Sequence, residues 1–182
     1  MCITLNEMSN MYPEHRFIMS NLEKILDKFT SKFRCVVIRE AKYEWKEFPN
    51  EKFEPDISIL CGLRHRKGLC YTDIPRFIAE ILSDSTEKRD REIKMNIYAT
   101  VGVQEYWIVD WRKPGGSVER YMLNDEGNKY ILHDIINGSI NIDKTIRDEE
   151  NKNVVLNIIS FPNWTFTMYD LMLHIGEEEI ME

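Results

Sequence analysis

Residues 76–82, RFIAEIL, constrain the fold of this chain more than any other segment. Apolar side chains occupy most positions of both alternating sets, which is typical of a strand buried on both faces of a sheet. Residues 83–86 follow directly and are all of types that favour helix N-caps, and the helix predicted after them runs to about Thr100 and stops near Gly102. A buried strand that feeds straight into a helix indicates a layered domain containing both helices and strands.

Hydrophobic periodicity predicts the remaining elements. An amphipathic helix is expected over residues 12–32, with His15 on its apolar stripe. Strands are expected at 34–43, 56–60, 104–111, 118–123, 129–136 and 154–158, an exposed loop at 62–68, and a short closing helix at 165–174. Because no repeat or linker divides the chain, we expect one α/β or α+β domain over residues 1–182, built around one sheet.

Charge and composition limit the partners and the compartment. The net charge of -7 argues against avid non-specific binding to nucleic acid, but a divalent metal can offset acidic side chains at a local site. We find no apolar stretch long enough to span a membrane and no basic segment followed by an apolar leader, so we expect a cytoplasmic protein. Reduced thiols are accordingly expected at all four cysteines, which are Cys2, Cys35, Cys61 and Cys70.

Three charged residues stand where packing alone does not explain them. Asp56 begins a short apolar strand, and Glu80 lies on the same strand face as Ile78 and Leu82. Lys94 falls within the apolar stripe of the next helix, which we expect to comprise Ile93, Ile97, Tyr98 and Val101. A buried charge costs several kcal/mol unless it is paired, protonated or bound to a cation. We therefore expect these three side chains to converge at the end of one sheet.

Two carboxylates and a lysine suit the hydrolysis of phosphodiesters. Carboxylate oxygens are ligands for Mg²⁺ or Mn²⁺, and such a metal lowers the pKa of a bound water and offsets phosphate charge. The ammonium of Lys94 could position that water or stabilise the transition state. The spacing leaves a structural alternative open, in which Glu80 and Lys94 form a partly buried ion pair and Asp56 lies at a solvated strand end.

Two stretches, 55–60 (PDISIL) and 79–86 (AEILSDST), resemble the "PD…EVLSPST" signature of the Uma-two "putative restriction endonuclease" family. This family belongs to the PD-(D/E)XK nuclease superfamily. The resemblance continues through Asp90, Lys94, Tyr98 and residues 102–110 (GVQEYWIVD). It also includes His15 in the first helix and residues 161–171 at the end of the chain, and it therefore covers most of the sequence.

The resemblance implies a restriction-endonuclease-like core, a central mixed sheet flanked by helices, and a Mg²⁺- or Mn²⁺-dependent endonuclease acting on DNA. Asp56 and Glu80 would hold the metal with the backbone carbonyl of Ile81. Lys94 would replace the usual superfamily lysine, whose position is occupied here by Leu82. Candidate accessory residues are His15, Asp90 and Tyr98. The family also suggests a homo-oligomer, in particular a dimer.

Other features leave alternatives to this reading. The family's acidic segment before the first helix is not clearly matched, since Glu7 is the only nearby acid. This gap and the acidic charge favour a catalytically inactive nuclease-fold module for binding or assembly. The basic cluster at residues 64–67 could contact phosphates or form a solvated loop. We expect Tyr106 and Trp107 in the core, Glu105 at the surface, and the acidic run at 177–179 in a solvated tail.

Overall fold

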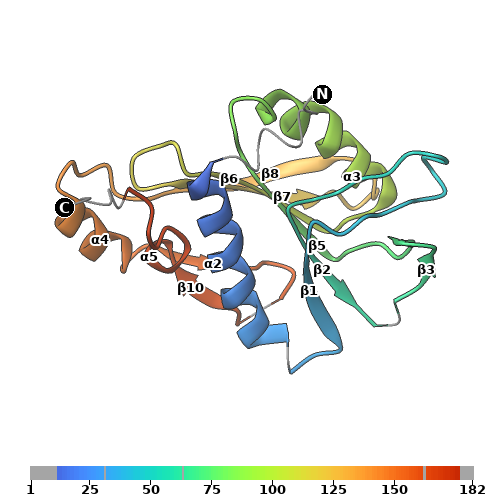
Figure 1. The fold of residues 1–182 in the computed structure, drawn as a ribbon, viewed down its shortest axis with the longest axis horizontal. Helices are drawn as coiled ribbons and strands as arrows, with labels where there is room; N and C mark the ends of the chain where they lie inside the picture. Colours follow the sequence, from blue (N-terminus) through green and yellow to red (C-terminus); the bar gives the residue numbers. More distant parts are fainter. Residues whose placement is uncertain (1–11, 31, 63, 162, 177–182) are drawn as a thin grey trace.

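The computed structural model describes residues 12–30, 32–62, 64–161 and 163–176. A six-stranded sheet with the order β1-β2-β5-β6-β7-β8 forms its centre (Figure 1). Its strands are β1 (Cys35–Arg39), β2 (Ile57–Cys61), β5 (Phe77–Ile81), β6 (Glu105–Asp110), β7 (Ser117–Leu123) and β8 (Tyr130–Asn137). The β5–β6 pair is parallel and the other pairs of this sheet are antiparallel, so the predicted mixed sheet is confirmed.

Helices and short hairpins surround this sheet. The helices are α2 (Pro13–Thr30), η1 (Arg89–Lys94), α3 (Met95–Val101), α4 (Lys144–Asn151) and α5 (Met168–Leu171). The hairpins pair β3 (Arg66–Lys67) with β4 (Cys70–Tyr71) and β9 (Val155–Asn157) with β10 (Thr165–Thr167). Figure 1 shows α2 and α3 on opposite sides of the sheet. Within the described residues, no helix has the length and apolar character needed to cross a membrane.

The strand β5 divides its side chains between two cores. Phe77, Ala79 and Ile81 pack with the apolar stripe of α2 and with the C-terminal segments. Ile78 packs on the opposite face, in a second core that includes residues of α3. All five residues of β5 are buried, which confirms that this strand is covered on both faces. By the alternation of a strand, Glu80 belongs to the α3 side.

The structure differs from the predicted elements at three places. Strand β1 stops at Arg39, because Glu40 adopts a left-handed backbone conformation (φ 47°) and turns the chain out of the sheet. The expected loop at 62–68 contains the short strand β3. The expected closing helix is reduced to α5, since residues 165–167 form β10 and Thr167 caps the helix with its side chain.

A disulfide joins Cys35 and Cys61, so the expectation of reduced thiols is wrong for this pair. The antiparallel register of β1 and β2 places these two residues directly opposite each other, although 26 positions separate them. Closing a loop of this length stabilises a fold by about 3.5 kcal/mol in the chain-entropy model. Cys70 is a free, buried thiol, as expected, and Cys2 lies outside the described residues.

The outer strand β8 leaves apolar side chains in contact with solvent. Ile131, Leu132 and Ile135 are each between 45% and 59% exposed. β8 is also the last strand of the sheet, so one of its backbone edges has no neighbour among the strands of this sheet. An open apolar edge of this kind can pair with another chain.

Candidate active site

The register of β2 and β5 brings the two predicted acids together. Ile57 of β2 lies opposite Ala79 of β5, and the strands are antiparallel. Asp56, which directly precedes β2, therefore lies beside Glu80. The backbone N–H of Asp56 donates to Oε2 of Glu80 at 3.4 Å. Strand pairing thus makes neighbours of two acids that are far apart along the chain.

Both carboxylate oxygens of Glu80 are held by side chains of the following helical segment. Nζ of Lys94 lies 2.8 Å from Oε2, and the hydroxyl of Tyr98 donates to Oε1 at 2.7 Å. The side chain of Glu80 is fully buried. Burial raises the pKa of Glu80 to about 8, against the opposing effect of the charge on Lys94. This carboxyl therefore retains a proton well above the usual pH range for glutamate.

Lys94 is a buried cation between two buried acids. It is only 7% exposed, and its Nζ lies 3.0 Å from Oδ1 of Asp90 as well as close to Glu80. Burial alone would lower the pKa of Lys94, but the charges of Glu80, Asp90 and Asp56 outweigh it and hold the pKa above its usual value. Lys94 is therefore charged at neutral pH.

The helix that carries Lys94 buries most of the predicted face, with Ile93 as the exception. Its first part, Arg89–Lys94, is a π-helix, and α3 continues from it. Asp90, Lys94 and Tyr98 are buried, whereas Ile93, expected on the buried stripe, is 55% exposed. Because a π-turn holds more residues than an α-turn, it changes which side chains face the sheet. Lys94, Tyr98 and Val101 therefore lie on the buried face, as predicted, whereas Ile93 does not.

Asp56 is held by a backbone N–H and a histidine. Its Oδ2 accepts the N–H of Ile81 at 2.7 Å and lies 3.2 Å from Nε2 of His15, which α2 carries. Burial would raise the pKa of Asp56, but the hydrogen bond from His15 and the charges of His15 and Lys94 hold it below its usual value. The His15 side chain is buried, and its Nδ1 has no hydrogen-bond partner among the described residues.

The structure thus brings together all the side chains singled out for catalysis or support. They are His15, Asp56, Glu80, Asp90, Lys94 and Tyr98. The acidic segment sought near Glu7 lies outside the described residues, as does the acidic run at 177–179.

We expect the free energy of unfolding of the metal-free protein to fall as the pH rises from about 4.5 to about 8. The pKa of Glu80 rises from 4.5 to about 8 on folding, so the folded state binds this proton more tightly. The resulting stabilisation is complete below 4.5 and is lost as the pH rises through the folded-state pKa. Urea unfolding of the wild type and Glu80→Gln across this interval measures it. Equal pH slopes in the two proteins would contradict the assignment.

The prediction that Glu105 lies at the surface is wrong. This residue is fully buried, and it lies at the start of β6 beside Phe77. Its carboxylate accepts hydrogen bonds from Nε1 of Trp107 and from the N–H groups of Ile159 and Ser160. Glu105 thus fixes a distant loop onto the sheet. The sequence does not reveal this, because two of the three donors, Ile159 and Ser160, lie more than fifty positions away.

Two further predictions concern residues near the site, namely the buried aromatic pair Tyr106 and Trp107 and the basic cluster at 64–67. Tyr106 and Trp107 are fully buried, as expected. The basic cluster at 64–67 is exposed. The contacts found for its members are local: His65 with Asp73, Arg66 with Tyr71, and Lys67 with Glu44. Within the described part of the chain, these contacts do not connect the cluster to Asp56 or Glu80.

Several oxygen atoms at this end of the sheet could serve a divalent cation. Asp56 and Glu80 supply carboxylates, which are hard ligands of the type Mg²⁺ and Mn²⁺ prefer. The N–H of Ile81 points to Asp56, and the N–H and C=O of one strand residue face the same side, so its carbonyl faces the same way. Within the described residues, no group of three or more His, Cys, Asp or Glu side chains could hold a metal ion. Any metal here would therefore need the backbone carbonyl or water as further ligands.

Comparison with known families shows to which protein family this chain belongs. Residues 4–150 match Uma2, whose description is "Putative restriction endonuclease". The chain belongs to the Uma2 family. The matched range includes every candidate site residue from His15 to Tyr98, and it confirms the resemblance inferred from the sequence.

Proteins similar to this Uma2 chain include one sequence relative and one solved structure. "Uncharacterized protein slr1290" of Synechocystis sp. is 35% identical over 80 residues, which are 43% of this chain and 41% of that protein. The match thus spans about two fifths of the relative's length. A crystal structure of a "putative nuclease belonging to DUF820" from Anabaena variabilis has a TM-score of 0.60 and 14% identity, covering 94% of this chain and 98% of the other. This likeness shows that the two proteins share a fold.

Proposed function

We propose that this Uma2 protein is a metal-dependent endonuclease that hydrolyses phosphodiester bonds of DNA. The observation that carries the proposal is the contact between Asp56, Glu80 and Lys94 at one end of the sheet. Membership of a family described as "Putative restriction endonuclease" supports the same reaction. A structural ion pair alone does not explain why a third buried acid, Asp90, also faces the single ammonium of Lys94.

Asp56, Glu80 and the carbonyl of Ile81 would hold Mg²⁺ or Mn²⁺. Such a metal supplies a more acidic bound water and neutralises charge on the phosphate. Lys94 would orient the attacking water or stabilise the negative charge that develops on the phosphate. Because the negative charges around Lys94 keep it protonated, we assign it this cationic role and not that of a general base.

The remaining three side chains would position the acids and the lysine. His15 orients Asp56 through Nε2, Tyr98 orients Glu80 through its hydroxyl, and Asp90 holds Lys94. Partners of this kind fix the direction in which a ligand or a cation points. Loss of any one of them should weaken the reaction less than loss of Glu80.

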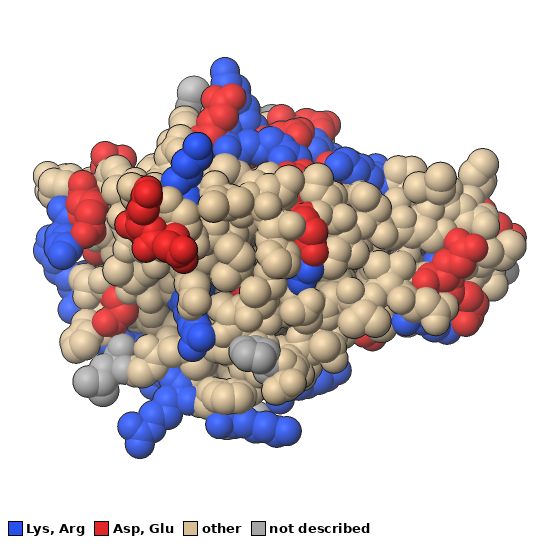
Figure 2. Space-filling model, turned by 180° about the vertical axis from the view of Figure 1, so that it is seen from behind, with Lys and Arg blue, Asp and Glu red and all other residues tan. Residues whose placement is uncertain are grey.

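The charge distribution suggests how the protein would select its substrate. Figure 2 shows Lys and Arg side chains in separate groups, with wide uncharged areas between them. Together with the net charge of -7, this favours recognition of DNA at a local, metal-containing site over broad electrostatic adhesion. A cytoplasmic location, where DNA is accessible, is part of the proposal. So is a homo-oligomer, for which the open apolar edge of β8 is the candidate interface.

We expect Mn²⁺ to raise the midpoint of thermal unfolding of the wild type at pH 8, because a ligand that binds only the folded state stabilises it. At this pH a large share of Glu80 is ionised even before the metal binds. Glu80→Gln should lose most of this shift. The same preparations should be assayed for nicking of supercoiled plasmid with Mg²⁺ or Mn²⁺. No shift and no nicking in the wild type would overturn the metal-dependent reaction.

A second candidate is a nuclease-fold module for binding or assembly that has lost its activity. One observation favours it, namely that both oxygens of the fully buried Glu80 are already occupied by Lys94 and Tyr98. In such a module these contacts would persist and the carboxylate would not turn to a metal. Binding of DNA without nicking, and without any effect of Mn²⁺ on stability, would support this candidate.

A further inference from the structure

A pocket of about 460 Å³ lies beside the disulfide, at the end of β2 farthest from Asp56. Both Cys35 and Cys61 line it and are partly buried, so the disulfide forms part of the wall of this pocket. Phe33, Arg34, Arg76 and Ser160 also line it. A disulfide bordering a cavity of this size is accessible to a small molecule, which sets it apart from a cross-link sealed in a core.

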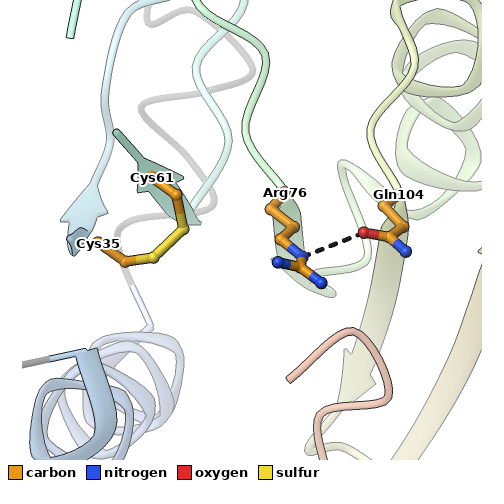
Figure 3. The surroundings of a disulfide bond; sticks show 4 residues. All are labelled: Cys35, Cys61, Arg76 and Gln104. Carbon is orange, nitrogen blue, oxygen red and sulfur yellow. Dashed lines mark hydrogen bonds between the residues drawn. A yellow bond between two sulfur atoms is a disulfide. The ribbon is translucent and has the colours of Figure 1, made fainter. Parts of the chain in front are cut away.

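Two arginines give this pocket a positive charge. Arg76 is held at its wall, because Nε donates to Oε1 of Gln104 at 3.1 Å and the guanidinium lies 4.7 Å from the ring centre of Phe161. Figure 3 shows the disulfide and Arg76 on neighbouring parts of the sheet, with Gln104 beyond the arginine. Arg34 directly precedes Cys35 and is exposed. A cationic pocket of this kind attracts an anionic ligand.

The surroundings of the pocket point the same way. Lys and Arg side chains gather along the lower edge of the face in Figure 2, the end of the molecule at which β1 begins in Figure 1. Ser160 adds a polar group inside the pocket. It is 4% exposed, and its Oγ has no hydrogen-bond partner among the described residues. An unpaired buried hydroxyl is costly, and a polar ligand could remove that cost.

We propose that Cys35 and Cys61 form a reversible redox site, which exchanges with an anionic low-molecular-weight thiol bound in this pocket. The positive charges of the arginines would attract the negatively charged groups of the ligand and so bring its thiolate to the disulfide. They would also stabilise the cysteine thiolate that leaves when the disulfide opens. This site is separate from the candidate active site and does not depend on the proposed nuclease activity.

The exchange consumes two molecules of the thiol. The first thiolate attacks one sulfur of the disulfide, the Cys35–Cys61 bond breaks, and a mixed disulfide forms while the other cysteine leaves as a thiolate and takes a proton from water. A second thiolate attacks the ligand sulfur of that mixed disulfide and releases the second cysteine thiolate, which is protonated in turn. The ligand is oxidised to its own disulfide, and the protein disulfide is reduced to two thiols. Reversal of both steps restores the cross-link.

The position of the pair gives the exchange a structural consequence. Cys35 and Cys61 are the first of the residue pairs that join β1 to β2. At the other end of β1, the N–H of Glu40 donates to the carbonyl oxygen of Asp56 at 3.1 Å. Because β1 is an edge strand, it has one strand neighbour in this sheet to hold it when the disulfide opens. Reduction would therefore loosen the strand that borders Asp56.

The test compares three small thiols of different charge on the folded, oxidised protein. Mercaptoethanesulfonate is an anion, 2-mercaptoethanol is neutral and cysteamine is a cation. Opening of the disulfide is followed by alkylation of the released thiols and intact mass, with rates divided by the thiolate concentration of each reagent. At low salt we expect the anion to react about tenfold faster than the neutral thiol, and the cation slowest. High salt should remove most of this order.

Variants assign the effect to the pocket. Arg34→Gln and Arg76→Gln should each reduce the preference for the anion, and together they should abolish it. Arg147→Gln is the matched control, because Arg147 lies on α4, well away from β1 in Figure 1. Equal rates for the three thiols in the wild type would overturn the proposal. It would equally fail if the disulfide opened only after unfolding, or if Cys35 and Cys61 remained free thiols after incubation with oxidised glutathione.

Discussion

Glu80→Gln should lower the rate of metal-dependent plasmid nicking by about 100-fold or more, the scale on which removal of one electrostatic partner of a transition state acts. The substitution keeps the size of the side chain and its contact with Tyr98, but it removes the negative charge required to hold a divalent cation. Folding should be preserved, because Lys94 keeps Asp90 as a buried partner. The measurement is the conversion of supercoiled to open-circular plasmid at saturating Mg²⁺ or Mn²⁺.

A matched control is available within the same sheet. Like Glu80, Glu105 is a strand glutamate with no exposed surface, but its carboxylate binds a loop instead of a lysine. Glu105→Gln should therefore lower stability and retain nicking at a temperature at which it is folded. Nicking at the wild-type rate by Glu80→Gln would remove Glu80 from the active site. Equal loss in both variants would indicate a general effect of losing a buried carboxylate.

Lys94→Met should lower the free energy of unfolding by about 3–5 kcal/mol at pH 8, as is typical when one partner of a buried ion pair is removed. The substitution leaves Glu80 and Asp90 buried without their cation. The loss should become smaller as the pH falls, because both carboxyls then take up protons and no longer need a counter-charge. Urea unfolding at pH 8 and at pH 5 measures both expectations.

The double variant Glu80→Gln, Lys94→Met distinguishes structure from catalysis. If the pair serves only to join helix and strand, removing both charges should recover much of the stability lost in Lys94→Met, since neutral replacements of buried pairs are often tolerated. Nicking should remain absent in the double variant if Lys94 and Glu80 act in the reaction. A stable double variant that still nicks plasmid DNA would show that neither residue is required.

The fold could be predicted where local pattern and burial agree. The double-sided apolar pattern of β5 and the stop at Gly102 are both found in the structure, where Gly102 caps α3 in a left-handed conformation. Predictions were wrong where a long-range contact decides the outcome. The register of β1 and β2 brings Cys35 to Cys61, and no property of either segment alone reveals that register.

The candidate site could be predicted in its members but not in its geometry. A carboxylate in a buried strand and a lysine on a buried helix face are conspicuous because each is costly alone, so Glu80 and Lys94 could be identified as partners. The place of His15 beside Asp56 follows from the way α2 packs across the sheet. The π-helical turn has no clear signature in RDREIK, and it decides which side chains face Glu80.

Because of this π-helical turn, the directions of the site side chains depend on the number of residues in Arg89–Lys94 as well as on their types. Each residue of an α-helix rotates the following side chain by about 100°. A homologous chain lacking one residue between Asp90 and Lys94 could keep Asp56, Glu80, Lys94 and Tyr98 in its sequence, but Lys94 and Tyr98 would then face in a different direction relative to Asp90. A comparison of motif residues alone would indicate that the site of such a chain is complete. Members of a family could therefore differ in activity through a one-residue deletion at this turn, although they keep the same motif.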